Sequence, residues 1–200
     1  FRICPLGFIC YRPLQKKPCS ERKYQSLDNI ELQKEMKKFF VTLLFLLPLT
    51  VVLAQSNNQL PVMVIKTLDG REVSTSVFEN EGKPYVVSFW ATWCRPCLKE
   101  LTAIDEIYED WKELGVKLIA ISTDDARTRA NVMPMVSGRG WDFEFYLDEN
   151  GELKRAMGVN MVPHTFILNG KGEVVYQHTS FSDGMEWEMY DKLKALLEDE

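Results

Sequence analysis

The sequence predicts an α/β fold in which a central mixed β-sheet lies between helices on both faces, with a β-hairpin added at its N-terminal side. Three observations predict it. Short apolar runs alternate with segments of helical periodicity over residues 61–200. A β-α-β order requires parallel strands joined by right-handed crossovers. A pair of strands joined by a turn at each end of this region adds antiparallel strands. The expected architecture is therefore a three-layer α/β/α sandwich.

The first elements of this region are a hairpin, a buried strand and a long helix. Asp69-Gly70 is a dipeptide typical of hairpin turns, with β-branched residues on both sides of it. The short apolar run that follows suits a buried central strand. The next segment has apolar residues at helical spacing and stops at Gly115. We expect strands at Val62–Lys66, Glu72–Ser76 and Tyr85–Trp90, and a helix from Pro96 to about Leu114.

The second half of the region alternates in the same way and ends in a hairpin and a helix. Asp124-Asp125 can cap a helix, and Asn169–Gly172 is a turn sequence between two apolar runs. The last segment is amphipathic, with its apolar residues at helical spacing. We expect strands at Val116–Ser122, Phe143–Leu147, His164–Leu168 and Glu173–His178, and helices at about Ala126–Ser137, Leu153–Met157 and Met185–Glu198.

Composition and charge exclude several classes of protein. The chain has 200 residues, is 46% hydrophobic and carries a net charge of −5, a balance opposite to that of most nucleic-acid-binding proteins. Its five cysteines are too few for a dense disulfide framework. Residues 1–54 carry nine Lys or Arg and four Asp or Glu, whereas residues 55–200 carry fifteen and twenty-five. We therefore expect two chemically different parts and no nucleic-acid partner.

The basic N-terminal part contains a segment with the three parts of a secretory signal. Lys37-Lys38 precede an almost wholly apolar run of 15 residues, and Val52-Leu53-Ala54 ends it with a small residue before Gln55. The run is shorter than the ~20 residues that a membrane-spanning helix needs. A cleaved signal peptide is the expected interpretation, with a retained N-terminal anchor or a buried helix as alternatives. The expected division is upstream sequence outside the working protein at 1–35, the signal at 36–54, a polar linker at 55–60 and the domain at 61–200.

The most informative stretch is Trp-Ala-Thr-Trp-Cys-Arg-Pro-Cys at residues 90–97, which ends the expected buried strand and opens the long helix. A thiol at a helix N-terminus faces unpaired backbone N–H groups and the positive end of the helix dipole, and both favour the nucleophilic thiolate. We expect Cys94 to be the exposed attacking thiol and Cys97, one turn inside, to be the resolving thiol. Pro96 suits the first helical turn, and Arg95 adds a positive charge next to the attacking thiol.

Two other interpretations of the cysteine pair remain to be compared with a redox-active dithiol. A Cys-x-x-Cys pair can be half of a zinc site, but such sites take four ligands as a rule, and residues 55–200 offer only His164 and His178 besides. An inert structural disulfide is the second, although a bridge across two residues closes too small a loop to stabilise much. We therefore favour a redox-active disulfide of Cys94 and Cys97, with no metal and no cofactor.

The combination of motifs resembles a known family. The stretch at residues 90–97, the Cys-x-x-Cys-x-x-Glu spacing and Val-Pro-His-Thr-Phe at residues 162–166 resemble the thioredoxin superfamily, and within it the exported TlpA/ResA-type thiol–disulfide oxidoreductases. The resemblance covers about residues 60–198. It implies a thioredoxin-like fold that exchanges disulfides through a mixed disulfide at its dithiol.

The resemblance also implies roles for residues around the dithiol. Pro163 matches the family's cis-proline, which would expose the backbone of Val162 to a substrate chain; an ordinary proline at a strand start is the alternative. Glu100 matches a carboxylate that lies near the dithiol and tunes it, with a solvated helix residue as the alternative. Ser88 stands where cytosolic thioredoxins have a buried Asp, so either Glu100 or water must move the proton of the resolving thiol. Trp93 is also a substrate-binding candidate, although a rim aromatic that shields the dithiol is the simpler interpretation.

The leading functional interpretation is an exported thiol–disulfide oxidoreductase that reduces disulfides of envelope proteins, as relatives do in cytochrome c maturation. The implied partners are protein thiols and disulfides and a membrane electron donor, and we expect a monomer in the periplasm or cell envelope. A peroxidase or thiol oxidase of the same superfamily is an alternative, although the Pro-x-x-x-Thr-x-x-Cys setting of peroxiredoxins does not precede Cys94. A peptide-holding or chaperone module without catalysis is another, and the intact dithiol argues against it.

Overall fold

The computed structural model describes residues 34, 37 and 58–198. The chain divides into two compact units, 1–56 and 57–200, and the fold below is that of the second. The expected upstream and signal segments lie outside the described residues, apart from residues 34 and 37. Within the described ranges, no helix combines the length and the apolar character needed to cross a membrane.

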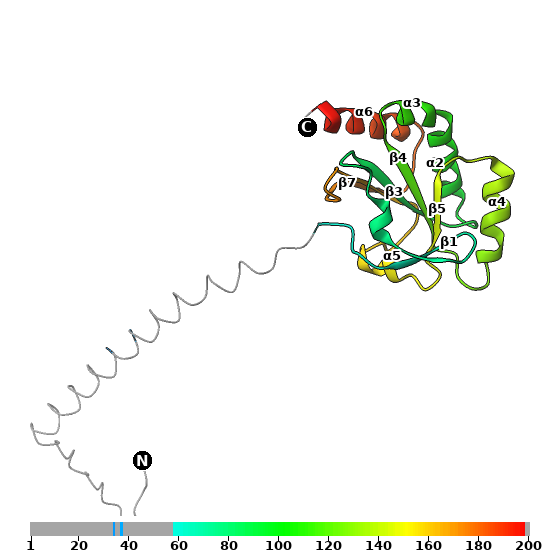
Figure 1. Cartoon of the computed structure of the whole chain (residues 1–200), viewed down its shortest axis with the longest axis horizontal. Coiled ribbons are helices and arrows are strands. Elements are labelled where there is room, and N and C mark those ends of the chain that lie inside the picture. Colours follow the sequence, from blue (N-terminus) through cyan, green and yellow to red (C-terminus); the bar gives the residue numbers. More distant parts are fainter. Residues whose placement is uncertain (1–33, 35–36, 38–57, 199–200) are drawn as a thin grey trace, which may run out of the picture. The chain divides into compact units, whose positions relative to one another are not determined.

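A mixed β-sheet forms the middle layer of this unit. Over residues 58–198 its seven strands are β1 Val64–Thr67, β2 Glu72–Ser74, β3 Tyr85–Trp90, β4 Lys117–Ser122, β5 Glu144–Leu147, β6 His164–Leu168 and β7 Val174–Thr179. Their order in space is β2-β1-β5-β4-β3-β6-β7 (Figure 1). β3, β4 and β5 are parallel, whereas both hairpins pair antiparallel with their neighbours. The expected N-terminal hairpin therefore forms one edge of the sheet, beside β5.

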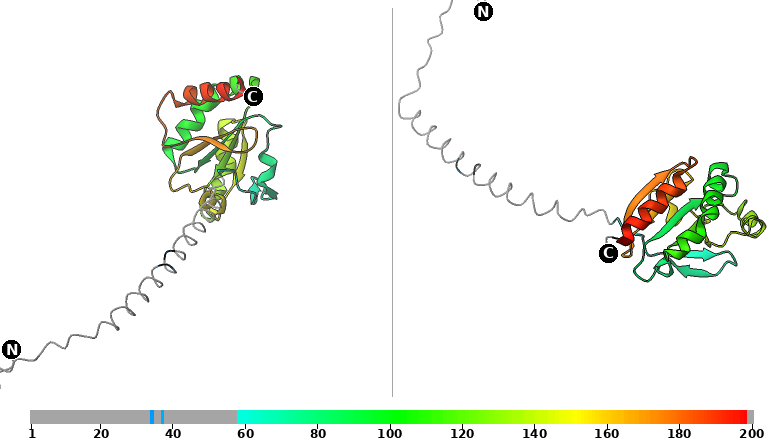
Figure 2. Two further views of the ribbon diagram at one scale, coloured as in Figure 1. Left: turned by 90° about the vertical axis from the view of Figure 1, so that its left-hand side faces the viewer. Right: turned by 90° about the horizontal axis from the view of Figure 1, so that it is seen from above.

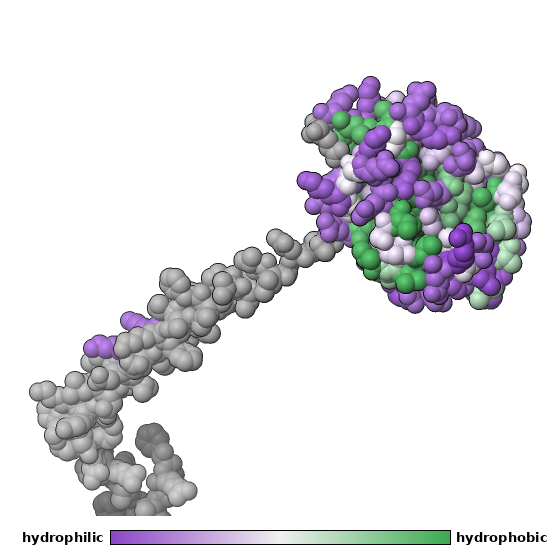
Figure 3. Space-filling model, viewed as in Figure 1, coloured by the Kyte–Doolittle hydropathy of each residue, from purple (hydrophilic) through white to green (hydrophobic). Residues whose placement is uncertain are grey.

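Helices cover both faces of the sheet, but unequally. On one face lie α2 Arg95–Glu106, α3 Tyr108–Glu113, α4 Val132–Arg139 and α6 Met185–Glu198 (Figures 1 and 2). The other face carries the short helix α5 Glu152–Ala156 and the 3-10 turn η1 Thr75–Phe78. This arrangement confirms the expected three-layer α/β/α sandwich. On the surface seen in Figure 3, hydrophilic residues predominate and hydrophobic residues gather in smaller groups.

The central strand β3 contributes to the core on both faces. Because successive side chains of a strand point to opposite faces, Val86 and Trp90 pack under the four-helix layer, and Val87 and Phe89 pack under α5 and η1. All residues of β3 are buried, and fully burying a large apolar side chain contributes about 1.5–3 kcal/mol. Ser88 lies between Val86 and Trp90 on the four-helix face, so a polar group stands in the middle of the core.

The long helix expected from Pro96 to about Leu114 is two helices. α2 ends at Glu106, and Ile107 leaves helical geometry with φ −119° and ψ 10° before α3 begins. The break brings Tyr108 to the sheet, where its hydroxyl accepts a hydrogen bond from the N–H of Leu118 at 3.2 Å. Apolar spacing along the sequence does not reveal this tertiary contact. It therefore predicts one helix where the chain forms two.

The helix expected from about Ala126 begins only at Val132, after the 3-10 turn η2 Arg129–Asn131. The expected cap is wrong for Asp124, whose carboxylate bonds to a loop elsewhere in the fold. Asp125 does accept a hydrogen bond from the N–H of Arg127 at 2.9 Å, but it holds a local turn rather than a helix start.

Residues 58–60, part of the expected linker, pair with the start of β7 and the turn before it. The N–H of Val174 donates to the carbonyl of Asn58 at 2.7 Å, and the N–H of Leu60 donates to the carbonyl of Gly172 at 3.1 Å. This short segment therefore adds backbone hydrogen bonds to the C-terminal hairpin.

Candidate active site

Cys94 lies at the junction between β3 and α2. The chain leaves β3 at Trp90 and enters α2 at Arg95, so Cys94 is the N-cap of the helix. The N–H of Cys97 donates to Sγ of Cys94 at 3.3 Å. Pro96 lies in the first turn, where its missing N–H leaves no bond unmade. The sulfur of Cys94 therefore lies at the positive end of the helix dipole, as the sequence predicts.

Cys94 and Cys97 form a disulfide, with their Cα atoms 5.3 Å apart. Cys97 is fully buried and Cys94 is 5% exposed. The order of exposure agrees with the expected roles, but Cys94 is not the exposed thiol that the sequence predicts. The reason is that the preceding loop folds back onto the core: the N–H of Cys94 donates to the carbonyl of Ala91 at 3.0 Å, and both residues join the apolar cluster around Trp90.

The loop before Cys94 is tied to the end of β4 by Asp124. The carboxylate of this fully buried residue accepts hydrogen bonds from the N–H of Thr92 at 2.8 Å and from its hydroxyl at 2.6 Å. It also accepts one from the hydroxyl of Ser122 at 2.8 Å. Because β3 and β4 are parallel neighbours, their carboxyl ends meet here, and Asp124 ties down the loop that leads to Cys94.

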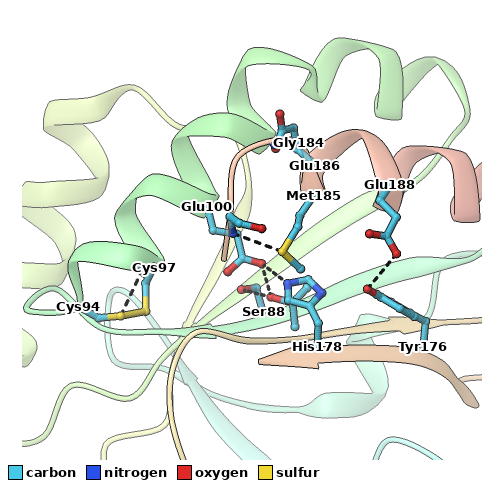
Figure 4. A network of polar contacts seen from close by, with 12 residues as sticks. Ser88, Cys94, Cys97, Glu100, Tyr176, His178, Gly184, Met185, Glu186 and Glu188 are labelled. Carbon is cyan, nitrogen blue, oxygen red and sulfur yellow. Dashed lines mark hydrogen bonds and ion pairs between the residues drawn. A yellow bond between two sulfur atoms is a disulfide. The ribbon is translucent and has the colours of Figure 1, made fainter. Parts of the chain in front are cut away.

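Glu100 lies on α2 three residues after Cys97 and is fully buried, so the interpretation as a solvated helix residue is wrong. Its Oε1 accepts a hydrogen bond from the hydroxyl of Thr165 at 2.7 Å and lies 2.9 Å from Nε2 of His178 (Figure 4). The hydroxyl of Thr165 is in turn 2.8 Å from that of Ser88. Residues at i and i+3 of a helix share a face, so the carboxylate of Glu100 lies on the same face of α2 as Cys97.

The segment before β6 offers groups for contact with another chain. The peptide bond between Val162 and Pro163 is cis, as the resemblance implies. Val162 packs against the cluster that contains both cysteines, and in the described part of the chain its N–H and C=O bond to no other backbone group. Trp93 is 65% exposed and Met161 is 60% exposed. Two exposed apolar side chains therefore directly precede Cys94 and Val162.

His164, next to the cis-proline, belongs to the other face of the sheet. Its ring stacks on Phe166 with the centroids 4.3 Å apart, and its Nε2 lies 3.0 Å from Oε1 of Gln177. Burial lowers the pKa of His164 below its ordinary value of 6.5. This histidine is therefore neutral at neutral pH, and among the described residues its ring is hydrogen-bonded to Gln177 rather than to Glu100.

Sequence reasoning missed Asp124, Thr165, His178 and Met161 as contributors to the site. The weak signal for Met161 was its position beside the expected cis-proline. Thr165 and His178 could be found only from the pairing of β6 with β7, and Asp124 only from the meeting of β3 with β4. No cluster of three or more metal-ligating side chains occurs in residues 34, 37 and 58–198, and the disulfide already occupies both thiols.

Comparisons with known proteins agree with this geometry. The AhpC/TSA family matches residues 57–177. A thiol–disulfide oxidoreductase ResA of Halalkalibacterium halodurans is 30% identical, over 74% of this chain and 80% of the relative. The sporulation thiol–disulfide oxidoreductase A of Bacillus subtilis is 28% identical, over 72% and 88%.

Solved structures give the same fold. An uncharacterised thioredoxin-like protein of Porphyromonas gingivalis is 44% identical with a TM-score of 0.63, over 72% of this chain and 95% of the other. StoA of Bacillus subtilis is 26% identical with a TM-score of 0.54, over 66% and 97%. With a disulfide at the start of a helix after a buried strand, and with relatives named for disulfide exchange, the chain belongs to the AhpC/TSA family as a thiol–disulfide oxidoreductase of thioredoxin-like fold.

Proposed function

We propose that this enzyme is exported and reduces disulfides of proteins in the cell envelope. Cys94 is the attacking thiol, Cys97 the resolving thiol and Glu100 the group that exchanges a proton with Cys97. The observation that carries the proposal is the arrangement along α2, in which Cys94 caps the helix and a buried carboxylate follows its disulfide partner at i+3. The signal-like segment at residues 36–54 supports export.

The reduced enzyme begins with Cys94 as the thiolate. Its sulfur attacks one sulfur of the substrate disulfide, the substrate S–S bond breaks, and the other substrate sulfur leaves as a thiolate that takes up a proton. Cys97 then gives its proton to Glu100 and attacks the sulfur of Cys94, which releases the second substrate sulfur and forms the Cys94–Cys97 disulfide. Two electrons have passed to the substrate, so a separate dithiol, such as a membrane electron donor, must reduce the enzyme again.

A protein is the substrate that the surroundings of Cys94 favour. Trp93 and Met161 are exposed apolar side chains, and the free N–H and C=O of Val162 can pair with an extended chain. A groove of about 600 Å³ also opens beside Arg95 and Lys99 of α2. These features support binding of a polypeptide around its disulfide.

The direction of exchange is tested by the equilibrium potential of the dithiol, measured against glutathione or dithiothreitol. A reductase is expected to lie below roughly −180 mV, the value of protein disulfide isomerase. A potential near about −120 mV, that of a strong oxidant, would overturn the assignment as a reductase.

The role of Glu100 is tested with Glu100→Gln, which keeps the shape of the side chain but takes up no proton. We expect the fold to remain and the exchange rate to fall by at least about 10-fold, with an altered pH–rate profile, because general acid–base catalysis contributes about 10²–10⁴-fold. A pH–rate profile that overlays the parent would exclude this role.

The alternatives and the site of action need separate assays. Reduced enzyme is expected to consume hydrogen peroxide no faster than its Cys94→Ser variant; faster consumption would favour a peroxidase. Unchanged function of Cys94→Ser would instead favour a peptide-holding module.

Preferential reduction of an oxidised Cys-x-x-Cys-His peptide, the haem attachment sequence, over a peptide with separated cysteines would support a role in cytochrome c maturation. N-terminal sequencing of material from the cell envelope is expected to begin at Gln55, and a chain that retains residues 36–54 would be an anchored form.

A further inference from the structure

A row of polar side chains crosses the sheet beneath α2. Ser88 of β3 lies opposite Thr165 of β6, and Thr165 lies opposite His178 of β7. Side chains directly opposite each other in antiparallel strands point to the same face, and this face is the one that the four-helix layer covers. The side chain of Glu100 extends from α2 toward the sheet and contacts Thr165 and His178 of this row. Its contact with His178 is visible in Figure 4.

Both polar contacts of Glu100 are made by one of its oxygens. Oε1 accepts from Thr165 and lies 2.9 Å from His178, whereas Oε2 is buried without a partner among residues 58–198. Thr165 has a single hydroxyl proton, which it donates to Glu100, so its contact with Ser88 is made with Ser88 as the donor. The hydrogen bonds therefore run in one direction, from Ser88 through Thr165 to the carboxylate.

The surroundings of His178 decide which of its ring nitrogens carries the proton. The side chain is 7% exposed, and Nδ1 is buried with no partner in the described part of the chain. A proton on Nδ1 would be buried without an acceptor, which is unfavourable. A proton on Nε2 is instead donated to Oε1 of Glu100. The tautomer with the proton on Nε2 is therefore preferred, and His178 is a hydrogen-bond donor to Glu100.

Two donors at Oε1 leave Oε2 as the oxygen that can gain or lose a proton. In Figure 4 the carboxylate of Glu100 lies between the disulfide and the ring of His178, which contacts Oε1. We propose that His178 is a positioning residue for Glu100: it holds Oε1 and thereby assigns Oε2 to the proton exchange with Cys97. The proposal rests on the proposed role of Glu100 and adds to it the group that orients the carboxylate.

Other ionisable groups surround this pair, and none of them bonds to Glu100 in the described residues. The ring of Tyr176 is 5.8 Å from that of His178, and its hydroxyl donates to Glu188 at 3.4 Å. Lys192 lies 4.5 Å from the ring centre of Tyr176. In any pH profile, the contributions of other ionisable groups must be distinguished from those of Glu100 and His178. These groups are His164 on β6, Tyr176 on β7, and Glu188 and Lys192 on α6.

The test measures the exchange of the reduced enzyme with oxidised glutathione between about pH 5 and pH 9, in variants whose folding is verified by urea unfolding. His178→Leu removes the donor to Glu100. We expect the exchange rate to fall by about 10-fold and the pH profile to change. This loss is smaller than the full contribution of general acid–base catalysis, which is about 10²–10⁴-fold. His178→Gln keeps an N–H at similar reach and is expected to stay within about 3-fold of the parent. Tyr176→Phe is the matched control on the same strand and is expected to keep the parental rate and profile.

The double variant separates action through Glu100 from a structural effect. In the Glu100→Gln background, His178→Leu is expected to cause no further loss, because residues that act as one unit are not additive. An equal loss in both backgrounds, or a parental profile for His178→Leu, would overturn the proposal. If His178→Leu does not fold, His178→Asn takes its place: its shorter amide cannot reach Oε1, so it must be slower than His178→Gln. If Glu100→Gln has the pH–rate profile of the parent, the proposed role of Glu100 itself is overturned. If the dithiol has the redox potential of a strong oxidant, only the assignment as a reductase is overturned.

Discussion

The reactivity of Cys94 follows from where its sulfur lies rather than from exposure. The residue is 5% exposed, yet its Sγ accepts the N–H of Cys97 and caps α2. When the disulfide is reduced, the same N–H can donate to the thiolate, and the helix dipole acts in the same direction. Cys97, fully buried one turn later, has no such donor at its sulfur among the described residues. This geometry distinguishes Cys94 from Cys97 as the candidate nucleophile.

Cys97→Ser is expected to accumulate mixed disulfides with protein substrates, because the resolving attack on Cys94 is missing. The trapped species can be counted on non-reducing gels and located by mass spectrometry of the linked peptides. In the reduced parent, Cys94 is expected to react with iodoacetamide before Cys97. Faster alkylation of Cys97 would mean that the two roles are reversed.

His164 links protein stability to pH. Its pKa in the folded state is lowered, first by burial, so the unfolded chain binds a proton more readily than the fold does. The contribution of the neutral side chain is present above the ordinary pKa of 6.5 and is lost as the pH falls through 6.5 towards the lower folded value. His164→Gln is expected to reduce the change in urea midpoint between about pH 7.5 and pH 5.5. If the variant shows the same pH dependence as the parent, the proton responsible for that dependence binds to a residue other than His164.

At the scale of elements, strands could be predicted more closely than helix ends. β3 and β6 have the expected bounds because each is a short, mainly apolar run, as is typical of a buried strand. The helix ends were missed where a side chain has a distant partner. Asp124 bonds to Thr92 instead of capping a helix, and the break at Ile107 brings Tyr108 to β4. Such contacts leave no trace in local periodicity.

The residues of the site also differ in how far the sequence alone could predict their positions. Cys97 and Glu100 lie three residues apart in α2, with Cys94 as its N-cap, so their spacing alone predicts that Cys97 and Glu100 share a face. His178 comes from a different strand, and its place opposite Thr165 depends on register. The pairing of β6 with β7 shifts between Ile167 and Leu168, so counting outward from the turn does not find the partner of Thr165.

Asp124→Ala is expected to loosen the loop before Cys94. It leaves the partly buried N–H and hydroxyl of Thr92 without their acceptor, and an unsatisfied buried group costs about 1–3 kcal/mol. We expect a loss of about 3 kcal/mol in the free energy of unfolding, measured by urea titration, together with slower disulfide exchange. Asp125→Ala is the matched control, because that exposed carboxylate contacts Arg127 in a local turn. Equal effects of the two substitutions would contradict the role of Asp124 as a tie.

At the scale of the whole domain, the site lies at one edge of the sheet where three strands meet. The carboxyl ends of β3 and β4 and the amino end of β6 come together there, since β3 runs parallel to β4 and antiparallel to β6. The four-helix layer closes the site from one side, and both faces of the sheet are filled by apolar clusters. The reacting groups therefore stand on rigid elements, whereas Trp93 and Met161 extend into solvent where a substrate can reach them.

The N-terminal boundary of the domain can be tested by truncation. Leu60 packs against the apolar cluster that contains Val87 and Phe89. Asn58 and Leu60 also bond to Val174 and Gly172 of the C-terminal hairpin, whose strands β6 and β7 hold Thr165 and His178. A chain that begins at Pro61 loses these two backbone hydrogen bonds, each worth about 0.5–1.5 kcal/mol. We expect it to be about 1–3 kcal/mol less stable to urea than a chain that begins at Gln55, and to exchange disulfides at a similar rate, because no group of the site is removed. Equal stability of the two chains would show that residues 58–60 belong to the linker, and a large loss of activity would show that the hairpin edge helps to set the position of His178.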